Sequence, residues 1–209
     1  MHIIAIEGLP LTGKTTLCKK IIDDLQTKGL KCLYCHHGHI TNNQLAEKYY
    51  IEAQKCLAAW DRKNYDYMQY FIDLCILSLV SDYRYFQLKK MDYNKYDFIL
   101  LDRHFTDQYV TADVFKVNYC EYIGIDEDDY YDFLLYCSYD ELKRRASIRQ
   151  DNHGNLTDFI LSSKNIYYQF QKTYIQHFEK NSPPNHIINN ECFNAKEIID
   201  NFILSLNIG

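Results

Sequence analysis

The chain has few of the residues that interrupt helices and strands, with 3 prolines and 7 glycines among 209 residues. It contains no internal repeat and no linker rich in glycine and serine. The longest apolar run, residues 72–80, is interrupted by Asp73 and Ser78 and is far shorter than the roughly 20 residues of a membrane span. We therefore expect a single domain over residues 1–209, with no membrane as a partner.

A surplus of positive charge is also missing, since 23 Lys and Arg face 28 Asp and Glu, for a formal net charge of −5. Proteins that bind a nucleic-acid backbone usually carry a basic surplus, so no nucleic-acid polymer is expected as a partner. A small anion needs only a local cluster of cations and is not excluded. The first residues, MHIIAIEGLP, lack the features of a signal peptide, so we expect a cytoplasmic protein whose 8 cysteines are reduced.

Short apolar runs alternate with longer helical stretches, which is typical of a parallel sheet with crossover helices. The pattern predicts an α/β fold with three αβα layers around five parallel strands. The expected strands are residues 2–7, 30–35, 96–101, 133–137 and 186–188. The expected helices are residues 15–28, 43–62, 65–91, 107–119, 139–149, 157–179 and 195–206. In the helix over 157–179, the helical spacing of four aromatic residues indicates a core face: Tyr167, Phe170, Tyr174 and Phe178.

One stretch matches a phosphate-binding motif in full. Residues 8–15, GLPLTGKT, fit G-x-x-x-x-G-K-[ST] between an apolar strand and a helix. The glycines let backbone N–H groups surround a phosphate, and the helix N-terminus adds partial positive charge. Lys14 would then reach the β- and γ-phosphates, and the Thr15 hydroxyl would bind Mg²⁺. The motif predicts a P-loop NTPase fold that binds ATP and Mg²⁺ through Gly8, Leu11, Thr12, Gly13, Lys14, Thr15 and Thr16.

Asp102 and Arg103 directly follow the third expected strand. Ligands of open α/β sheets bind beyond the carboxyl ends of the strands, so both residues are expected near the triphosphate. Asp102 could hold Mg²⁺ directly or through water, and Arg103 could bind a phosphate or carboxylate of the acceptor. The alternative is an Asp that caps the next helix beside a solvated Arg.

A basic cluster lies in the expected helix over 139–149. Arg145 and Arg149 are four residues apart and share a face, whereas Arg144 is turned about 100° away. A helical lid over about residues 142–157 could close these arginines over the β,γ-bridge and stabilise the charge that develops during transfer. The alternative is a solvated basic face.

These features resemble the thymidylate kinase and deoxynucleoside kinase superfamily. EGLPLTGKTT is similar to the EGxDGxGKST loop of thymidylate kinases. The triplet at 102–104, Asp-Arg-His, looks like their Asp-Arg-Tyr and like the Glu-Arg-Ser of deoxynucleoside kinases. Residues 81–84 are similar to the family's Ala-Asp-Arg region, which would turn Arg84 toward the acceptor.

The resemblance implies an ATP- and Mg²⁺-dependent kinase, a helix-paired homodimer, and phosphoryl transfer to a nucleoside or nucleotide. The catalytic residues would be Lys14, Asp102, Arg103, Arg145 and Arg149. Arg144 would bind the nucleotide, Thr15 and Asp102 the Mg²⁺, and His36, Arg84 and Arg103 the acceptor.

The chain departs from the family at several positions. Pro10 stands where thymidylate kinases carry an Asp, and Leu11 supplies no loop arginine. After the second strand, His-His-Gly-His at 36–39 replaces the Arg-Glu-Pro or Glu-Pro of the family. A hydroxyl acceptor benefits from a general base, for which His36, His37 and Asp102 are candidates, and a phosphate acceptor benefits from cations.

The sequence is therefore compatible with either a hydroxyl or a phosphate as the attacking group of the acceptor. A kinase for a non-nucleotide natural product or sugar is the alternative function. A regulatory module that binds a nucleotide without transferring its phosphate is a third.

Overall fold

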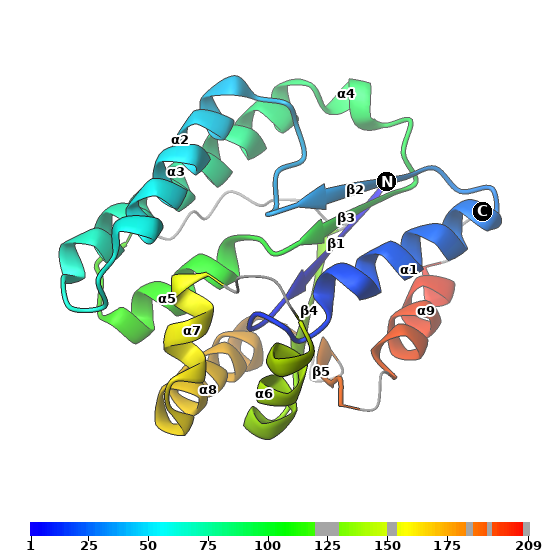
Figure 1. The fold of residues 1–209 in the computed structure, drawn as a ribbon. Helices are drawn as coiled ribbons and strands as arrows, with labels where there is room; N and C mark the ends of the chain where they lie inside the picture. The colour runs from blue at the N-terminus through cyan, green and yellow to red at the C-terminus, as the bar shows by residue number, and fades with distance from the viewer. Residues whose placement is uncertain (120–129, 150–153, 183–185, 192–193, 207–209) are drawn as a thin grey trace.

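The computed structural model describes residues 1–119, 130–149, 154–182, 186–191 and 194–206, so residues 150–153 of the expected lid lie outside it. At its centre, five strands run parallel in the order β2-β3-β1-β4-β5 (Figure 1). They are β1 (His2–Glu7), β2 (Cys32–His36), β3 (Phe98–Asp102), β4 (Tyr130–Tyr136) and β5 (Ile187–Asn189). The expected α/β fold with a five-stranded parallel sheet is confirmed.

Helices cover both faces of this sheet. α1 and α9 lie on one face, and α3, α5 and α8 lie on the other (Figure 1). No described helix is both long enough and apolar enough to pass through a lipid bilayer. The helices are α1 (Lys14–Thr27), α2 (Gln44–Ala59), α3 (Tyr65–Leu88), α4 (Lys90–Tyr93), α5 (Phe105–Phe115), α6 (Tyr139–Ile148), α7 (Asn155–Leu161), α8 (Lys164–Asn181) and α9 (Ala195–Ser205).

The side chains of β1 alternate between two cores. Ile4 and Ile6 pack with α1 and α9, whereas Ile3 and Ala5 pack on the side of α3. Because helices cover both faces, the strand needs apolar residues at consecutive positions rather than at every second one. The aromatic stripe predicted for the core is buried as expected on α8, at Tyr167, Phe170, Tyr174 and Phe178.

The single helix expected over 157–179 is wrong, because α7 and α8 take its place. The hydroxyl of Ser162 donates to the carbonyl of Phe159 at 2.6 Å, and the side chain of Ser163 accepts from the N–H of Asn165 at 3.2 Å. Serine side chains compete with a helix for its backbone groups, so this pair ends α7 and caps α8.

The strand order places a crevice at the carboxyl end of β1. The connection after β1 leads to β2 on one side of this strand, whereas the connection after β3 leads to β4 on its other side. Ligands of open parallel sheets bind where the direction of the connections reverses in this way. In the register of the sheet, Asp102 lies beside both Ile6 and His36. The loops that follow β1, β2 and β3 therefore meet at this edge.

Gly8 begins the loop after β1 in close contact with β4. Its φ is 129°, and a Cβ built there would lie 2.1 Å from the backbone oxygen of Leu135. Gly29 has a φ of 83° and no atom within 4 Å of a built Cβ. Of these two glycines, Gly8 alone combines a positive φ with a lack of space for a Cβ.

We predict that Gly8→Ala lowers the free energy of unfolding by about 1–3 kcal/mol more than Gly29→Ala, because only the former crowds a neighbouring strand. Gly29→Ala isolates the cost of the left-handed backbone alone, about 1–2 kcal/mol. Urea denaturation of both variants measures the difference, and equal losses would contradict the close approach.

Candidate functional site

The loop from Gly8 to Gly13, which we call the β1–α1 loop, folds around the side chain of Lys14. This side chain is buried, and its Nζ donates to the carbonyls of Gly8 and Leu9, both at 2.7 Å. Burial, followed by the charge of Arg103, lowers the pKa of Lys14 to about 8. Gly13 starts α1 without any side chain capping its first N–H groups. An uncapped helix end beside an ammonium group favours an anion.

Each of the three loops at this edge holds one non-glycine residue in the left-handed region. They are Leu11 at φ 67°, His37 at φ 56° and Arg103 at φ 77°, and all three line one hollow. Such a backbone costs on the order of 1–3 kcal/mol per residue and persists where its surroundings hold it. The strain is thus concentrated where the loops meet.

The carboxylate of Asp102 joins the loop to β2. It accepts a hydrogen bond from the Thr15 hydroxyl and one from the Tyr34 hydroxyl at 3.0 Å, and His36 Nδ1 lies 3.1 Å away. Burial alone would raise the pKa of Asp102, but His36, the charge of Lys14 and the two hydroxyls hold it well below its ordinary value. Asp102 is therefore ionised at neutral pH.

Thr15 and Asp102 bring a hydroxyl oxygen and a carboxylate oxygen into contact at the mouth of the loop. These are ligand types that suit Mg²⁺, which usually keeps several waters and takes one or two carboxylates together with phosphate oxygens. The described residues include no cluster of three or more His, Cys, Asp or Glu side chains suited to a metal. An ion at this pair would take further oxygens from water or a bound ligand.

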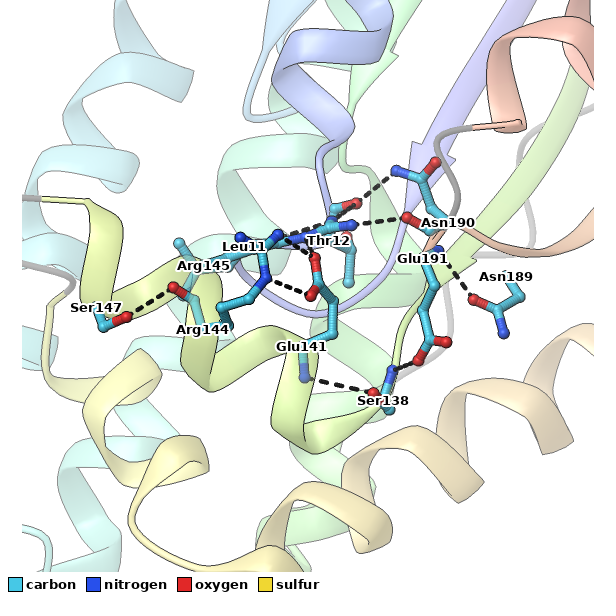
Figure 2. Close-up of polar contacts among 10 residues, drawn as sticks. All are labelled: Leu11, Thr12, Ser138, Glu141, Arg144, Arg145, Ser147, Asn189, Asn190 and Glu191. Atoms are coloured by element: carbon cyan, nitrogen blue, oxygen red, sulfur yellow. Dashed lines mark hydrogen bonds and ion pairs between the residues drawn. The ribbon is translucent and has the colours of Figure 1, made fainter.

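Arg145 braces the β1–α1 loop from α6. Its guanidinium donates to the carbonyls of Thr12 at 2.9 Å, Leu11 at 3.3 Å and Asn190 at 2.7 Å, and Glu141 accepts from its Nε at 2.7 Å (Figure 2). The side chain is only 12% exposed. Arg145 therefore stabilises the β1–α1 loop and lies directly beside it.

The other two arginines of the cluster lie differently. Arg144 pairs with Glu141 at 2.7 Å and does not line the hollow at the loop. Arg149 is exposed and lines this hollow together with Arg145. The face shared by Arg145 and Arg149 is thus turned to the loop, and Arg144 is turned away.

Two hollows meet at these loops. The larger, which we call the loop hollow, has a volume of about 450 Å³ and lies over the β1–α1 loop, Asp102 and the α6 arginines. The smaller, which we call the helix hollow, has a volume of about 230 Å³ and is lined by residues of α2, α3, α5 and α7. The lining residues common to both are Pro10, His37, Arg103 and Thr157. The two hollows are therefore adjacent.

An ion pair lies in the helix hollow. Arg103 Nη1 is 2.7 Å from Asp107 Oδ2, and the hydroxyl of Tyr174 donates to the other oxygen of Asp107. Burial would lower the pKa of Arg103, but the charge of Asp107 raises it. Sequence reasoning missed Asp107, although its position four residues after Arg103 on an expected helix was a usable signal.

Glu7 is a second residue that sequence reasoning missed. Glu7 is the last residue of β1 and is fully buried, and neither oxygen of its carboxyl group has a hydrogen-bond partner of normal geometry in the described part of the chain. Burial, with the charge of Asp107 as the second cause, raises the pKa of Glu7 to about 8, although the backbone N–H of His104 opposes the rise. A charged residue at the end of an otherwise apolar strand was the available signal.

Arg84 does not reach either hollow, contrary to its expected place beside an acceptor. It lies on the exposed surface of α3 and is not among the residues that line these spaces. Its neighbour Asp82 is buried and accepts from the N–H groups of Ile40 at 2.6 Å and Thr41 at 3.1 Å. This part of α3 therefore anchors the chain that follows β2.

Comparison with protein-family models finds no match, and no curated protein sequence matches the chain. The assignment of a function therefore depends on the residues of this site and their geometry.

We predict that Arg145→Ala lowers the free energy of unfolding by about 2–3 kcal/mol, because it removes the donor to three backbone carbonyls and leaves Glu141 without that partner. Arg144→Ala, which removes only an exposed pair with the same glutamate, should cost much less. Thermal and urea unfolding of the two variants measure the contrast, and similar losses would contradict the bracing role of Arg145.

Glu7 should make stability depend on pH. In the unfolded chain its carboxyl ionises near pH 4.5, whereas in the folded protein it stays neutral up to about pH 8. Its contribution to stability is therefore full below pH 4.5 and is lost as pH rises toward 8. Glutamine does not ionise, so Glu7→Gln lacks this loss. The unfolding free energy of the variant should therefore rise relative to that of the native protein as pH increases from about 5 to about 8.

Urea unfolding across this range tests the prediction. Asp140→Asn, which alters an exposed carboxylate, serves as the control and should show no such trend. A difference between Glu7→Gln and the native protein that stays constant with pH would contradict the raised pKa.

Proposed function

We propose that the protein is a P-loop kinase that transfers the γ-phosphoryl group of ATP to a small molecule, with Mg²⁺. The observation that carries the proposal is the meeting of Lys14 and Thr15, from the phosphate-binding motif, with Asp102 in the loop hollow, which adjoins the helix hollow. One hollow suits the donor and the adjoining one suits an acceptor.

The loop hollow is the proposed donor site. Phosphates would lie on the N–H groups of the β1–α1 loop and the uncapped start of α1. Lys14, which now donates to the carbonyls of Gly8 and Leu9, would turn to the β- and γ-phosphates. Mg²⁺ held by Thr15 and Asp102 would neutralise charge on these phosphates.

Cations around the loop hollow are suited to charge that develops during transfer. Arg149 lies at the rim and Arg145 is already within reach of the loop, so both are proposed to stabilise the transferring group. Arg103 lines both hollows and is proposed to orient the acceptor. Asp102 is proposed to bind Mg²⁺, and His36 Nδ1 lies within hydrogen-bond distance of its carboxylate at 3.1 Å.

The acceptor is a nucleoside, a nucleotide or a related small molecule in this proposal. A non-nucleotide acceptor is the second candidate. His37 lines both hollows, and it lies in the segment where deoxynucleoside kinases carry Glu-Pro, so the acceptor site differs from theirs at this point. The helix-paired homodimer stays a prediction, with which the exposed Tyr70, Leu77 and Leu88 of α3 are compatible.

We predict that the protein releases ADP from ATP and Mg²⁺ in the presence of an acceptor, and that Asp102→Asn lowers turnover by about a hundredfold or more. The carboxylate is needed for the metal and for its bonds to Thr15 and His36, whereas ATP is bound mainly by the loop. ATP binding by the variant, measured by calorimetry, should therefore stay detectable.

A panel of nucleosides, nucleotides and small alcohols read by ADP release tests the prediction, with Asp92→Asn on the exposed α4 as the control. Unchanged turnover of Asp102→Asn would remove this residue from the mechanism. Binding of ATP without phosphorylation of any acceptor, together with nucleotide-dependent binding of a partner, would favour the regulatory module instead.

A further inference from the structure

The helix hollow contains little net positive charge. Arg103 is the only Lys or Arg among its lining residues, and it is paired with Asp107 at 2.7 Å. The imidazoles of the lining, His37, His39 and His104, ordinarily lose their proton near about pH 6.5. Residues outside the described ranges include no Lys and no Arg, so none of them adds such a cation.

The loop hollow differs sharply in its charge. Among the described residues, its lining includes one carboxylate, that of Asp102, and six Lys and Arg side chains: Lys14, Lys20, Arg103, Arg145, Arg149 and Lys196. A phosphate monoester carries a charge of about −1.5 to −2 at neutral pH and would lie beside Asp107 in the helix hollow. Burying this charge without unpaired cations is unfavourable. The helix hollow is therefore suited to an uncharged molecule.

The walls of the helix hollow are apolar and partly aromatic. Tyr50 of α2 and Phe71 of α3 contribute rings, and Leu57, Leu79 and Leu156 contribute aliphatic side chains. A flat ring packs well on such surfaces. The volume of about 230 Å³ restricts the occupant to a small molecule.

One polar atom of this lining has no partner. The side-chain oxygen of Gln108, on α5 directly after Asp107, is buried and accepts no hydrogen bond from the described part of the chain. A buried acceptor without a donor costs free energy, which a ligand N–H or O–H would recover. The side-chain oxygen of Gln108 could therefore accept a hydrogen bond from a donor group on the molecule that fills the hollow.

We infer that the acceptor is an uncharged molecule with a flat ring and a hydrogen-bond donor, phosphorylated on a hydroxyl group rather than on a phosphate. The inference rests on the proposed kinase function. The ring lies between α2 and α3, its donor bonds to Gln108, and the hydroxyl is directed to the junction at His37 and Arg103.

The transfer balances without another reactant. The hydroxyl oxygen forms a bond to the γ-phosphorus, and the bond from this phosphorus to the β,γ-bridging oxygen breaks with its electron pair going to ADP. The hydroxyl proton goes to water, so the products are a phosphate monoester, ADP and one proton. Because the transition state is loose, the proton can leave late and a strong base is not required.

Matched acceptors test the inference. Nucleosides are compared with their own 5′-monophosphates, and with analogues that lack the 5′-hydroxyl, by ADP release with ATP and Mg²⁺. We expect kcat/KM to be at least about a hundredfold higher for the nucleoside of at least one pair, and no activity with its deoxygenated analogue. A monophosphate that is the better acceptor in every active pair would overturn the inference but support the proposed kinase. No ADP release with any acceptor would overturn both.

Gln108→Leu provides a second test, in which both the thermal stability of the ligand-free protein and the KM for the acceptor are measured. The variant should unfold at the same or a higher temperature without ligand, because it removes an unpaired buried oxygen, and should raise KM for the active acceptor by about tenfold with little change in kcat. Gln44→Leu, at an exposed position of α2 that lines neither hollow, is the control and should leave KM nearly unchanged. An unaltered KM in Gln108→Leu would overturn the role of Gln108.

Discussion

The carboxylate of Asp102 is the group on which the geometry of the site depends. It is buried at the end of β3, yet it is ionised because hydroxyls from Thr15 and Tyr34, the ring of His36 and the charge of Lys14 all favour the anion. Thr15 and Lys14 belong to α1, and Tyr34 and His36 belong to β2. One buried anion thus links the start of α1 to the strand that precedes the residues of the helix hollow, and its charge is at the same time suited to a metal.

The two hollows divide the charge of the site between them. Cations gather around the loop hollow, whereas in the helix hollow the charge of Arg103 is offset by Asp107. Glu7 at the end of β1 stays protonated up to about pH 8 because of its burial and the charge of Asp107. The difference in charge between the two hollows suits the proposed transfer, in which a polyanion and an uncharged molecule would occupy adjacent spaces.

Local patterns were sufficient for most elements of the fold. The apolar runs predict all five strands because a sheet covered on both faces needs consecutive apolar residues. One exception is informative, since the helix expected over 157–179 is interrupted at Ser162 and Ser163, whose side-chain hydrogen bonds end α7 and cap α8. The spacing of apolar residues predicts which face of a helix is buried. It does not predict how the backbone N–H and C=O groups between two helices are hydrogen-bonded.

The contiguous part of the candidate site could be predicted from local sequence, because the eight residues of the loop motif and the Asp-Arg pair after β3 each form one short segment. Tertiary structure alone decided which distant residues meet them. The register of β2 and β3 brings His36 to Asp102, the fold of α6 turns Arg145 to the loop, and the exposed face of α3 keeps Arg84 away. Strand order and helix rotation set these distances, and neither is encoded in the spacing of a short motif.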